Sequence, residues 1–191
     1  MRAHGHGGDS EVSKVSKVSE VSEVDADPAE SSGPGGSATA AALATGFGDA
    51  DESPGLLLWQ VTNRWQAAIR AALAPFDLTH VQFVLLASLT WLTGRSGGEP
   101  VMQRDIAAQA ATDPMMTSQV LRALEQKGLV ERRDHPTDRR AKSLVPTKDG
   151  AALVNRAIVA VEACDREFFA PLTDVTRFGA SLRALRDRET P

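Results

Sequence analysis

Hydrophobic residues recur every three or four positions through most of the chain from residue 56 onward, a spacing typical of helices that bury one face. Between Gly128 and Gly150 the pattern changes to two short strand-like runs joined by a turn. The predicted fold is therefore mostly α, with one small β-hairpin. The predicted helices span 56–73, 79–93, 102–110, 114–127, a long segment after Thr147 that is broken at Pro171, and 174–186.

Capping residues and apolar stripes define these helices further. Thr79 and Gln82 have the spacing of a capping box, and Gly94 is expected to follow the end of their helix. Thr147 is the expected N-cap of the long helix. The stripe of the first helix is Leu58, Thr62, Trp65, Ile69 and Leu73, and that of the long helix is Leu153, Ala157, Val161, Cys164 and Phe168.

The segment 102–127 is typical of two helices separated by a tight turn. In the second helix, Asp113 is the expected N-cap and Pro114 the first residue, so we expect its unpaired amide groups to point outward. Its apolar face is predicted to contain Met116, Val120, Ala123 and Leu124, with Leu121 at the edge. Its outward face is predicted to contain Met115, Ser118, Gln119, Arg122 and Gln126. A helix of this kind can enter a DNA major groove.

The hairpin that follows carries many cations, which favours binding to a polyanion, here duplex DNA. These cations are Arg132, Arg133, Arg139, Arg140 and Lys142. An ordinary solvated charged face is the alternative interpretation. Surface polarity is likewise the alternative for Ser118 and Gln119, and Arg122 could bridge Glu125 or Gln126 instead of contacting a base.

Together these segments form a winged helix-turn-helix, and the chain resembles the MarR family of bacterial regulators over Leu56 to Leu185. The most specific stretch runs from Met116 to Arg132, followed by Asp138-Arg-Arg-Ala and Thr147-Lys-Asp-Gly. The chain departs from the family pattern at Pro146, which is expected to shorten the second strand, and at Ala110 and Ala111 in the turn.

The resemblance implies that 114–127 is the recognition helix. It also implies that Arg140 probes the minor groove and that Asp138 braces the wing against Arg132. The predicted DNA contacts are Thr117, Ser118, Gln119, Arg122, Arg139, Arg140 and Lys142.

The outer helices, 55–78 and 148–191, have apolar faces that look too wide to be covered within one chain, whereas 79–147 is the predicted DNA-binding part. The resemblance implies that the outer helices build a twofold homodimer. Such a dimer would bind a pseudo-palindromic operator whose half-sites lie about 34 to 36 Å apart. Candidates for the shared core are Trp59, Trp65, Phe168, Phe169 and Leu182.

The resemblance also implies a small-molecule effector, because relatives bind hydrophobic anions and phenols between the dimer helices and the winged domain. The function predicted is therefore a repressor that a small aromatic or phenolic ligand releases from DNA. The candidate ligand contacts are Trp59, Trp65, Phe83, Trp91 and Met102, each of which could instead be a core residue.

The net charge of −4 is unusual for a DNA-binding protein, but the charge is unevenly distributed. Residues before Leu56 carry ten acidic and three basic side chains, a net charge of −7, which leaves +3 for the remainder. Residues 1–54 also contain a Val-Ser repeat and a Ser-, Gly- and Pro-rich run, so we expect a disordered acidic tail, with a repeat-built helix as the alternative. We find neither a signal peptide nor a membrane span in the sequence, and therefore expect a cytoplasmic protein with no membrane partner.

The remaining chemistry-bearing residues do not suggest a catalytic site. Cys164 lies on an apolar stripe, which favours a buried structural cysteine over a peroxide-sensing thiol. His80 and His135 lack a set of ligands at metal-binding spacing, and no nucleophile with a matching base is evident, so we expect no metal, cofactor or enzymatic activity. Two rival functions remain: a DNA-organising protein with little sequence preference, and a winged-helix protein-interaction module.

Overall fold

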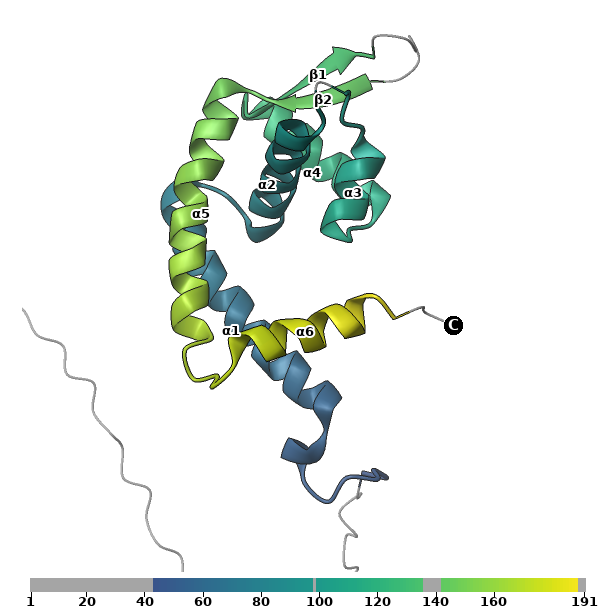
Figure 1. Cartoon of the computed structure of the whole chain (residues 1–191), viewed down its shortest axis with the longest axis vertical. Coiled ribbons are helices and arrows are strands. Elements are labelled where there is room, and N and C mark those ends of the chain that lie inside the picture. The colour runs from purple at the N-terminus through teal and green to yellow at the C-terminus, as the bar shows by residue number, and fades with distance from the viewer. Residues whose placement is uncertain (1–42, 98, 136–141, 189–191) are drawn as a thin grey trace, which may run out of the picture. The chain divides into compact units, whose positions relative to one another are not determined.

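The computed structural model describes residues 43–97, 99–135 and 142–188 and divides the chain into two units, Met1–Ala44 and Thr45–Pro191. The second unit is mostly helical, with one antiparallel hairpin beside the central helices (Figure 1). Its elements are η1 (Ala50–Glu52), α1 (Pro54–Leu73), η2 (Ala74–Phe76), α2 (His80–Arg95), α3 (Gln103–Ala110), α4 (Pro114–Gln126), β1 (Val130–Asp134), β2 (Lys142–Pro146), α5 (Lys148–Phe168) and α6 (Val175–Arg186).

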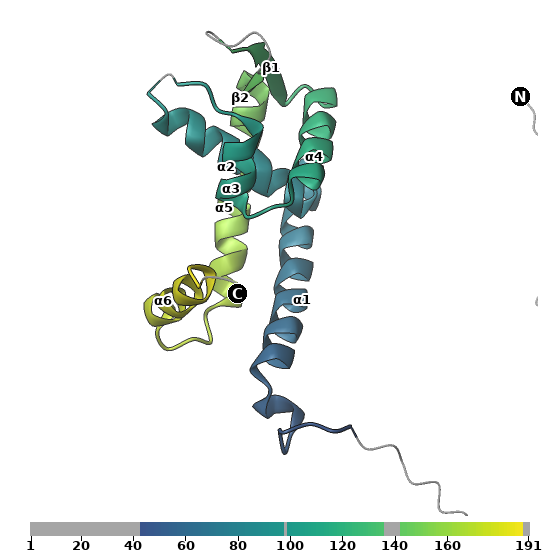
Figure 2. The ribbon, with the colours of Figure 1, turned by 90° about the vertical axis from the view of Figure 1, so that its right-hand side faces the viewer.

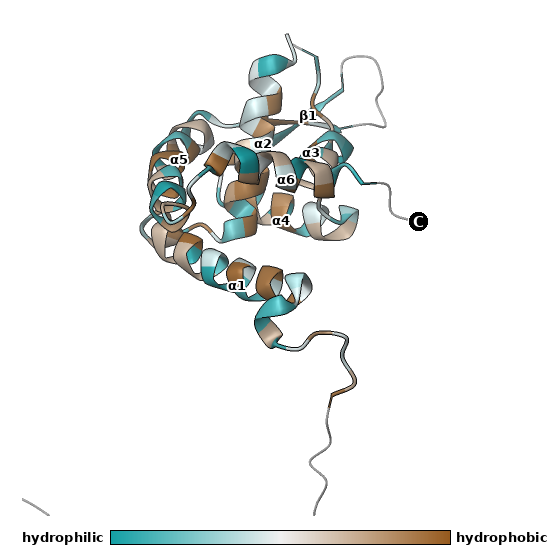
Figure 3. Cartoon of the chain, turned by 60° about the horizontal axis from the view of Figure 1, so that its bottom comes forward, coloured by the Kyte–Doolittle hydropathy of each residue, from teal (hydrophilic) through white to brown (hydrophobic). Residues whose placement is uncertain are grey.

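Helix α1 is buried only at its C-terminal end. Ser53 is its N-cap and Pro54 its first residue, although both fall inside the predicted tail. Of the predicted stripe, Ile69 and Leu73 are fully buried, whereas Leu58 is 55% exposed. The first half of α1, where hydrophobic positions are brown in Figure 3, therefore carries apolar side chains that are exposed to solvent.

Helix α2 begins at the predicted capping box, in which Thr79 and Gln82 exchange hydrogen bonds of 3.1 and 3.2 Å. The expected end at Thr93 is wrong, because the helix continues through Gly94 to Arg95. The positive φ that terminates the segment lies at Gly97 instead, where glycine adopts it without a Cβ clash.

The hydrophobic core surrounds α2, which packs against the C-terminal half of α1 and against α3, α4, α5 and the wing strand β2. The hairpin runs in register from Val130 opposite Pro146 to Asp134 opposite Lys142, so Pro146 ends β2. Val101 adds an isolated bridge to Leu144. The largest fully buried apolar side chains are Ile69, Leu73, Leu85, Leu86, Leu89, Ile106, Leu121, Leu124 and Leu144.

A tight joint connects the wing to α5. The Thr147 hydroxyl accepts a hydrogen bond from the Gly150 N–H at 3.0 Å and donates to the Gly128 carbonyl at 2.8 Å. A Cβ added at Gly150 would lie 2.0 Å from the Leu129 carbonyl oxygen. The Thr-Lys-Asp-Gly sequence therefore places both a cap and a close backbone approach at this joint.

Helices α5 and α6 differ in how much of their surface is covered. In α5 the buried apolar residues are Val154, Ala157 and Val161, so Ala157 and Val161 of the predicted stripe are buried, whereas Leu153, Cys164 and Phe168 are only half-buried. None of the residues of α6 is buried, and Figure 2 shows this helix standing off from α1.

No single helix among the described residues is long and apolar enough to cross a membrane. Pro54–Phe76 and His80–Arg95, bent by 73° at their break, meet that criterion only when taken together.

Candidate nucleic-acid interface

The N-terminus of α4 is closed by its own cap. The Asp113 carboxylate accepts hydrogen bonds from the backbone N–H groups of Met115 at 2.8 Å and Met116 at 3.0 Å. The prediction that unpaired amides point outward here is therefore wrong for these two groups. The negative charge of Asp113 also opposes a phosphate at this end, so side chains are what α4 offers to DNA.

The buried face of α4 consists of Thr117, Leu121 and Leu124. Thr117 is fully buried, and its hydroxyl lies 2.8 Å from both the Asp113 carbonyl oxygen and the Thr112 hydroxyl. This position excludes a direct base contact by the Thr117 side chain, contrary to the prediction. The buried face is thus rotated toward Thr117 and away from Met116, which is 39% exposed.

The opposite face of α4 forms one surface stripe, which we call the reading stripe. It consists of Met115, Ser118, Gln119 and Arg122. The last three follow Met115 by three, four and seven positions, so all four lie on one side of the helix. Ser118 is half-buried and the other three are exposed. Met115 was predicted to face outward but was not among the predicted contacts, which were chosen for their hydrogen-bonding groups.

Acidic partners accompany the described cations at the base of the wing. Arg132 Nε donates to Glu125 at 3.0 Å, and the Arg132 side chain is 27% exposed. Glu125 thus joins α4 to β1. The predicted brace between Arg132 and Asp138, like the predicted contacts of Arg139 and Arg140, involves residues outside the described part of the chain.

Two further ion pairs on the hairpin are exposed to solvent. Arg133 contacts Glu131 at 3.0 Å, and this hydrogen bond lowers the pKa of the Glu131 carboxyl below its ordinary value. Lys142, a predicted DNA contact, pairs with Asp134. Exposed pairs of this kind contribute little to stability, so either cation can exchange its partner for a phosphate at low cost.

A lysine ties the far end of α4 to the turn after α1. Lys127 Nζ lies 2.6 Å from the Asp77 carbonyl oxygen and 2.9 Å from its carboxylate. Asp77 has a left-handed backbone conformation, with φ 51°. The C-terminus of α4 is therefore tied to the turn between α1 and α2.

A second junction joins α1, α2 and α5. Trp65 Nε1 donates to the Asp165 carboxylate at 2.8 Å, and the Trp65 ring meets the His80 ring edge-to-face at 5.1 Å between centroids. Burial lowers the pKa of His80, and Arg70 lowers it further, whereas Asp165 opposes the shift. Cys164 lies half-exposed beside this junction, and desolvation followed by Asp165 and Glu167 raises its pKa, which disfavours the reactive thiolate.

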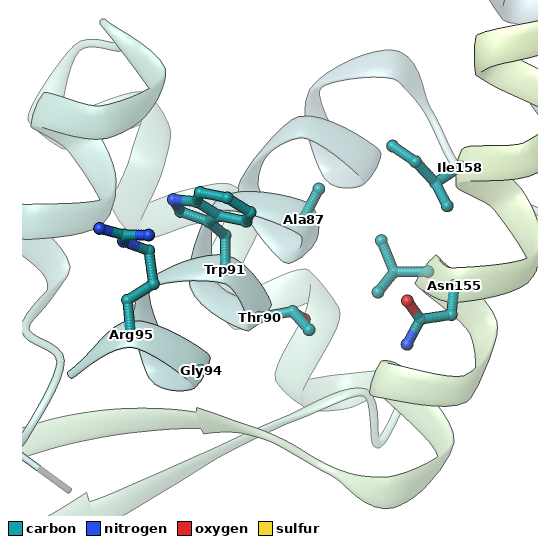
Figure 4. Close-up of a pocket in the computed structure, with 8 residues that line it drawn as sticks. Ala87, Thr90, Trp91, Gly94, Arg95, Asn155 and Ile158 are labelled. Atoms are coloured by element: carbon teal, nitrogen blue, oxygen red, sulfur yellow. The ribbon is translucent and has the colours of Figure 1, made fainter. Parts of the chain in front are cut away.

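A pocket of about 400 Å³ lies between α2 and α5 (Figure 4). Trp91 is 58% exposed, and the Arg95 guanidinium lies 5.4 Å from its ring centroid. Facing them from α5 are Asn155 and Ile158. The full lining is Ala87, Thr90, Trp91, Gly94, Arg95, Val154, Asn155 and Ile158.

The other predicted ligand contacts do not line this pocket. Phe83 is a buried core residue, Trp65 belongs to the α1–α5 junction, and Trp59 is 66% exposed on α1. Met102 is the N-cap of α3, where its N–H donates to Asp105 at 2.9 Å. The structure thus distributes the five predicted ligand residues over different environments, with only Trp91 at the described pocket.

Two sequence comparisons agree with this arrangement. The model of the MarR family matches residues 78–142, which include α2, α3, α4 and β1. The HTH-type transcriptional regulator YdcH of Bacillus subtilis (strain 168) is 43% identical over 143 residues, covering 75% of this chain and 96% of the relative.

Solved structures show the same fold. CouR from Rhodococcus jostii RHA1, bound to p-coumaroyl-CoA, matches with a TM-score of 0.64 and 27% identity, covering 76% of this chain and 99% of CouR. CouR has also been solved as a transcriptional repressor bound to a 23-mer DNA duplex. Bordetella bronchiseptica BpsR, whose DNA binding is regulated by 6-hydroxynicotinic acid, matches with a TM-score of 0.65 and 27% identity, covering 75% of this chain and all of BpsR.

Proposed function

The chain belongs to the MarR family of helix-turn-helix transcriptional regulators, and on that premise we propose that it is a homodimeric, sequence-specific repressor released from DNA by an aromatic ligand. The observation that carries the DNA-binding part is the reading stripe of α4. Gln119 and Arg122 are exposed on a helix that is fixed at one end by the Asp113 cap and at the other by Lys127. A rigid helix with projecting hydrogen-bonding side chains can read base edges in a major groove.

The wing supplies the complementary grip on the phosphates. Lys142 and Arg133 can exchange their exposed acidic partners for phosphate oxygens, a contact that carries no sequence information. Arg139 and Arg140 lie outside the described residues, and we propose them as DNA contacts from the sequence alone. Arg132 acts instead as a positioning residue through Glu125, and Thr117 as part of the core.

The dimer is proposed from the apolar surface of the outer helices. Leu58 and Trp59 on α1 and Leu182 and Leu185 on α6 are all more than 40% exposed, and burying such side chains is worth about 1.5 to 3 kcal/mol each. A second copy of the chain supplies a matching surface by twofold symmetry. The operator is then pseudo-palindromic, with half-sites about 34 to 36 Å apart.

The α2–α5 pocket is the proposed effector site. Its walls are apolar except for the Arg95 guanidinium, the Asn155 amide and the Thr90 hydroxyl, and the exposed Trp91 ring offers a flat stacking surface. This composition favours a planar aromatic acid or phenol. A ligand that reduces operator affinity a hundredfold must bind the free form better than the DNA-bound form by about 2.7 kcal/mol.

Operator selection tests the DNA-reading function. A pool of random duplexes is selected with the wild-type chain and with Arg122→Ala, and affinity for the selected operator is compared with affinity for random competitor DNA. We expect the wild type to select a pseudo-palindrome and Arg122→Ala to relax base preference at one symmetric pair of positions, at a cost of about 1 to 3 kcal/mol. If random DNA competes as well as the selected operator, the result favours a DNA-organising protein. If DNA binding does not weaken as salt is added, the result favours a protein-interaction module.

Two further measurements test the dimer and the effector site. Trp59→Glu with Leu185→Glu should convert the dimer to a helical monomer with weakened operator affinity, measured by light scattering and circular dichroism. Arg95→Ala should weaken binding of aromatic carboxylates, measured by tryptophan quenching, while operator affinity stays unchanged. A ligand whose affinity is the same with and without operator is not the inducer.

A further inference from the structure

Met115 is a large apolar side chain in open solvent at the start of α4, with 73% of its surface exposed. Many of the other exposed large apolar residues in the described chain lie on the outer helices, where a second copy would cover them. A single exposed apolar side chain needs no special explanation. Its position relative to the other residues of α4 therefore decides what Met115 can do.

Helical spacing places Met115 on the same side of α4 as Gln119 and Arg122, four and seven positions further along. The axial rise from Met115 to Arg122 is about 10 Å, which matches about three base-pair steps of a duplex. Met115 thus forms the N-terminal end of the reading stripe, one helical turn before Gln119, in the part of a recognition helix that approaches the bases.

The backbone at this turn is held in place, so the Met115 side chain projects from a fixed point. The N–H of Met115 donates to Asp113 at 2.8 Å, and the Pro114 carbonyl accepts from Gln103 Nε2 of α3 at 3.3 Å. With its N–H used, Met115 offers a ligand an apolar surface and no hydrogen-bond donor. The adjacent Asp113 carboxylate repels phosphate, which leaves the base edges as the groups that this turn can approach.

We propose that Met115 determines specificity for thymine, by packing its thioether side chain against the C5-methyl group of a thymine in each half-site. The inference rests on the proposed function of α4 as the reading helix. The thymine methyl is the apolar group on the major-groove edges of the standard base pairs. A methionine side chain is flexible and polarizable enough to follow that surface. Gln119 and Arg122 contact hydrogen-bonding edges, and Met115 adds the apolar part of the same readout.

The test uses the full-length chain and the operator that it selects from random duplexes. Each thymine in one half-site, together with its symmetry mate, is replaced by deoxyuridine, which removes only the methyl group and keeps the base pair. One symmetric pair of replacements should weaken wild-type binding by about fourfold per half-site, from the transfer of one methyl group out of water. Fluorescence anisotropy at fixed salt measures the change.

Variants of Met115 then assign the effect. Met115→Ala should bind the thymine and deoxyuridine operators equally, whereas Met115→Leu should keep a preference for thymine. Met116→Ala is the matched control, because Met116 is the same residue type about 100° further around the helix and is less exposed. This control should retain the full thymine preference.

The outcomes separate this inference from the function on which it rests. A wild type that responds to none of the deoxyuridine replacements overturns the proposal for Met115 and leaves the reading helix intact. The same holds if Met115→Ala retains the thymine preference. Selection of no operator at all overturns both the reading helix and the role of Met115.

Discussion

At the scale of single residues, His80 makes the stability of the fold depend on pH. The ring packs edge-to-face on Trp65, and its pKa lies below the ordinary value of 6.5, because burial disfavours the charged form and Arg70 adds to this effect. A histidine that is held neutral in the folded state stabilises the fold above the pKa of the unfolded chain. That contribution is lost as the pH falls through 6.5 toward the lowered folded pKa.

We therefore predict that His80→Phe makes stability less dependent on pH. A phenyl ring keeps the edge contact with Trp65 but does not titrate. Thermal unfolding of wild type and variant should be compared from about one pH unit above 6.5 to about one unit below. The wild type should lose more stability on acidification than the variant, and parallel curves would contradict the prediction.

Residue chemistry alone predicted several caps. Asp113, Thr79 with Gln82, and Thr147 all act as the sequence indicated, because a capping side chain bonds backbone groups within its own turn. Thr117 was misassigned for the complementary reason. Its hydroxyl forms hydrogen bonds with the Asp113 carbonyl and the Thr112 hydroxyl, so this polar residue can be buried. A hydrophobic pattern counts threonine as polar and therefore places it on the outer face.

At the scale of elements, helix existence was predictable and the exact face was not. Gly94 lies inside α2 because a glycine in open space costs a helix only about 1 kcal/mol. In α5, Val154 rather than Leu153 is buried, and Gly150, one turn earlier, closely approaches the Leu129 backbone. Such tertiary contacts do not appear in a local hydrophobic pattern.

The two glycines give a matched prediction of opposite sign. Gly150→Ala should destabilise the fold by about 1 to 3 kcal/mol or more, because its Cβ would meet the Leu129 backbone at 2.0 Å. Gly94→Ala should stabilise it by about 0.5 to 1 kcal/mol, since nothing lies within 4 Å of the added Cβ. Chemical denaturation of both variants measures the difference, and equal midpoints would show that the close approach at Gly150 relaxes freely.

The wing gives a prediction about charge. Asp134→Asn removes the acidic partner of Lys142 and should strengthen binding to all DNA sequences alike, by about two- to fivefold at low salt, the size of an exposed ion pair. The gain should shrink as salt is added. Asp187→Asn is the matched control, because Asp187 forms an exposed ion pair with Arg186 at the end of α6. A gain confined to the operator would contradict a phosphate contact by Lys142.

At the scale of the whole molecule, the family and the winged helix-turn-helix were predictable because a long ordered motif carries them. The α2–α5 pocket was not, since it forms between Trp91 and Arg95 of α2 and Asn155 of α5, about sixty positions apart in the sequence. The sequence signalled the exposed surface of α1 and α6 only as apolar faces wider than one chain can cover. Its proposed partner is a second chain, which no local pattern can orient.

The uneven charge of the whole chain leads to a last prediction. Residues 1–42 contain seven acidic and three basic side chains, a net charge of −4 tethered to a DNA-binding region. Deleting 1–42 should strengthen non-specific DNA binding, most clearly at low salt, by removing a competitor for the basic residues. The melting temperature should not change, because Asp49 and Ser53, which cap η1 and α1, are retained.

A full-length variant with those seven acids changed to glutamine is the control for chain length. It should bind like the deletion variant. Loss of the gain in this variant would show that excluded volume, rather than charge, is responsible.

The contacts at Thr147 connect the wing closely to the N-terminus of α5. Its 21 residues span about 30 Å from the base of the hairpin to the outer helices. The hydrogen bonds of Thr147 and the close approach of Gly150 to Leu129 leave the wing little freedom to move relative to the start of α5. A tilt of about 5° at one end of a rod of that length moves the other by about 2 to 3 Å, comparable to one base-pair step. A tilt of α5 about its Phe168 end would thus shift the wing by nearly one base-pair step along the proposed DNA site.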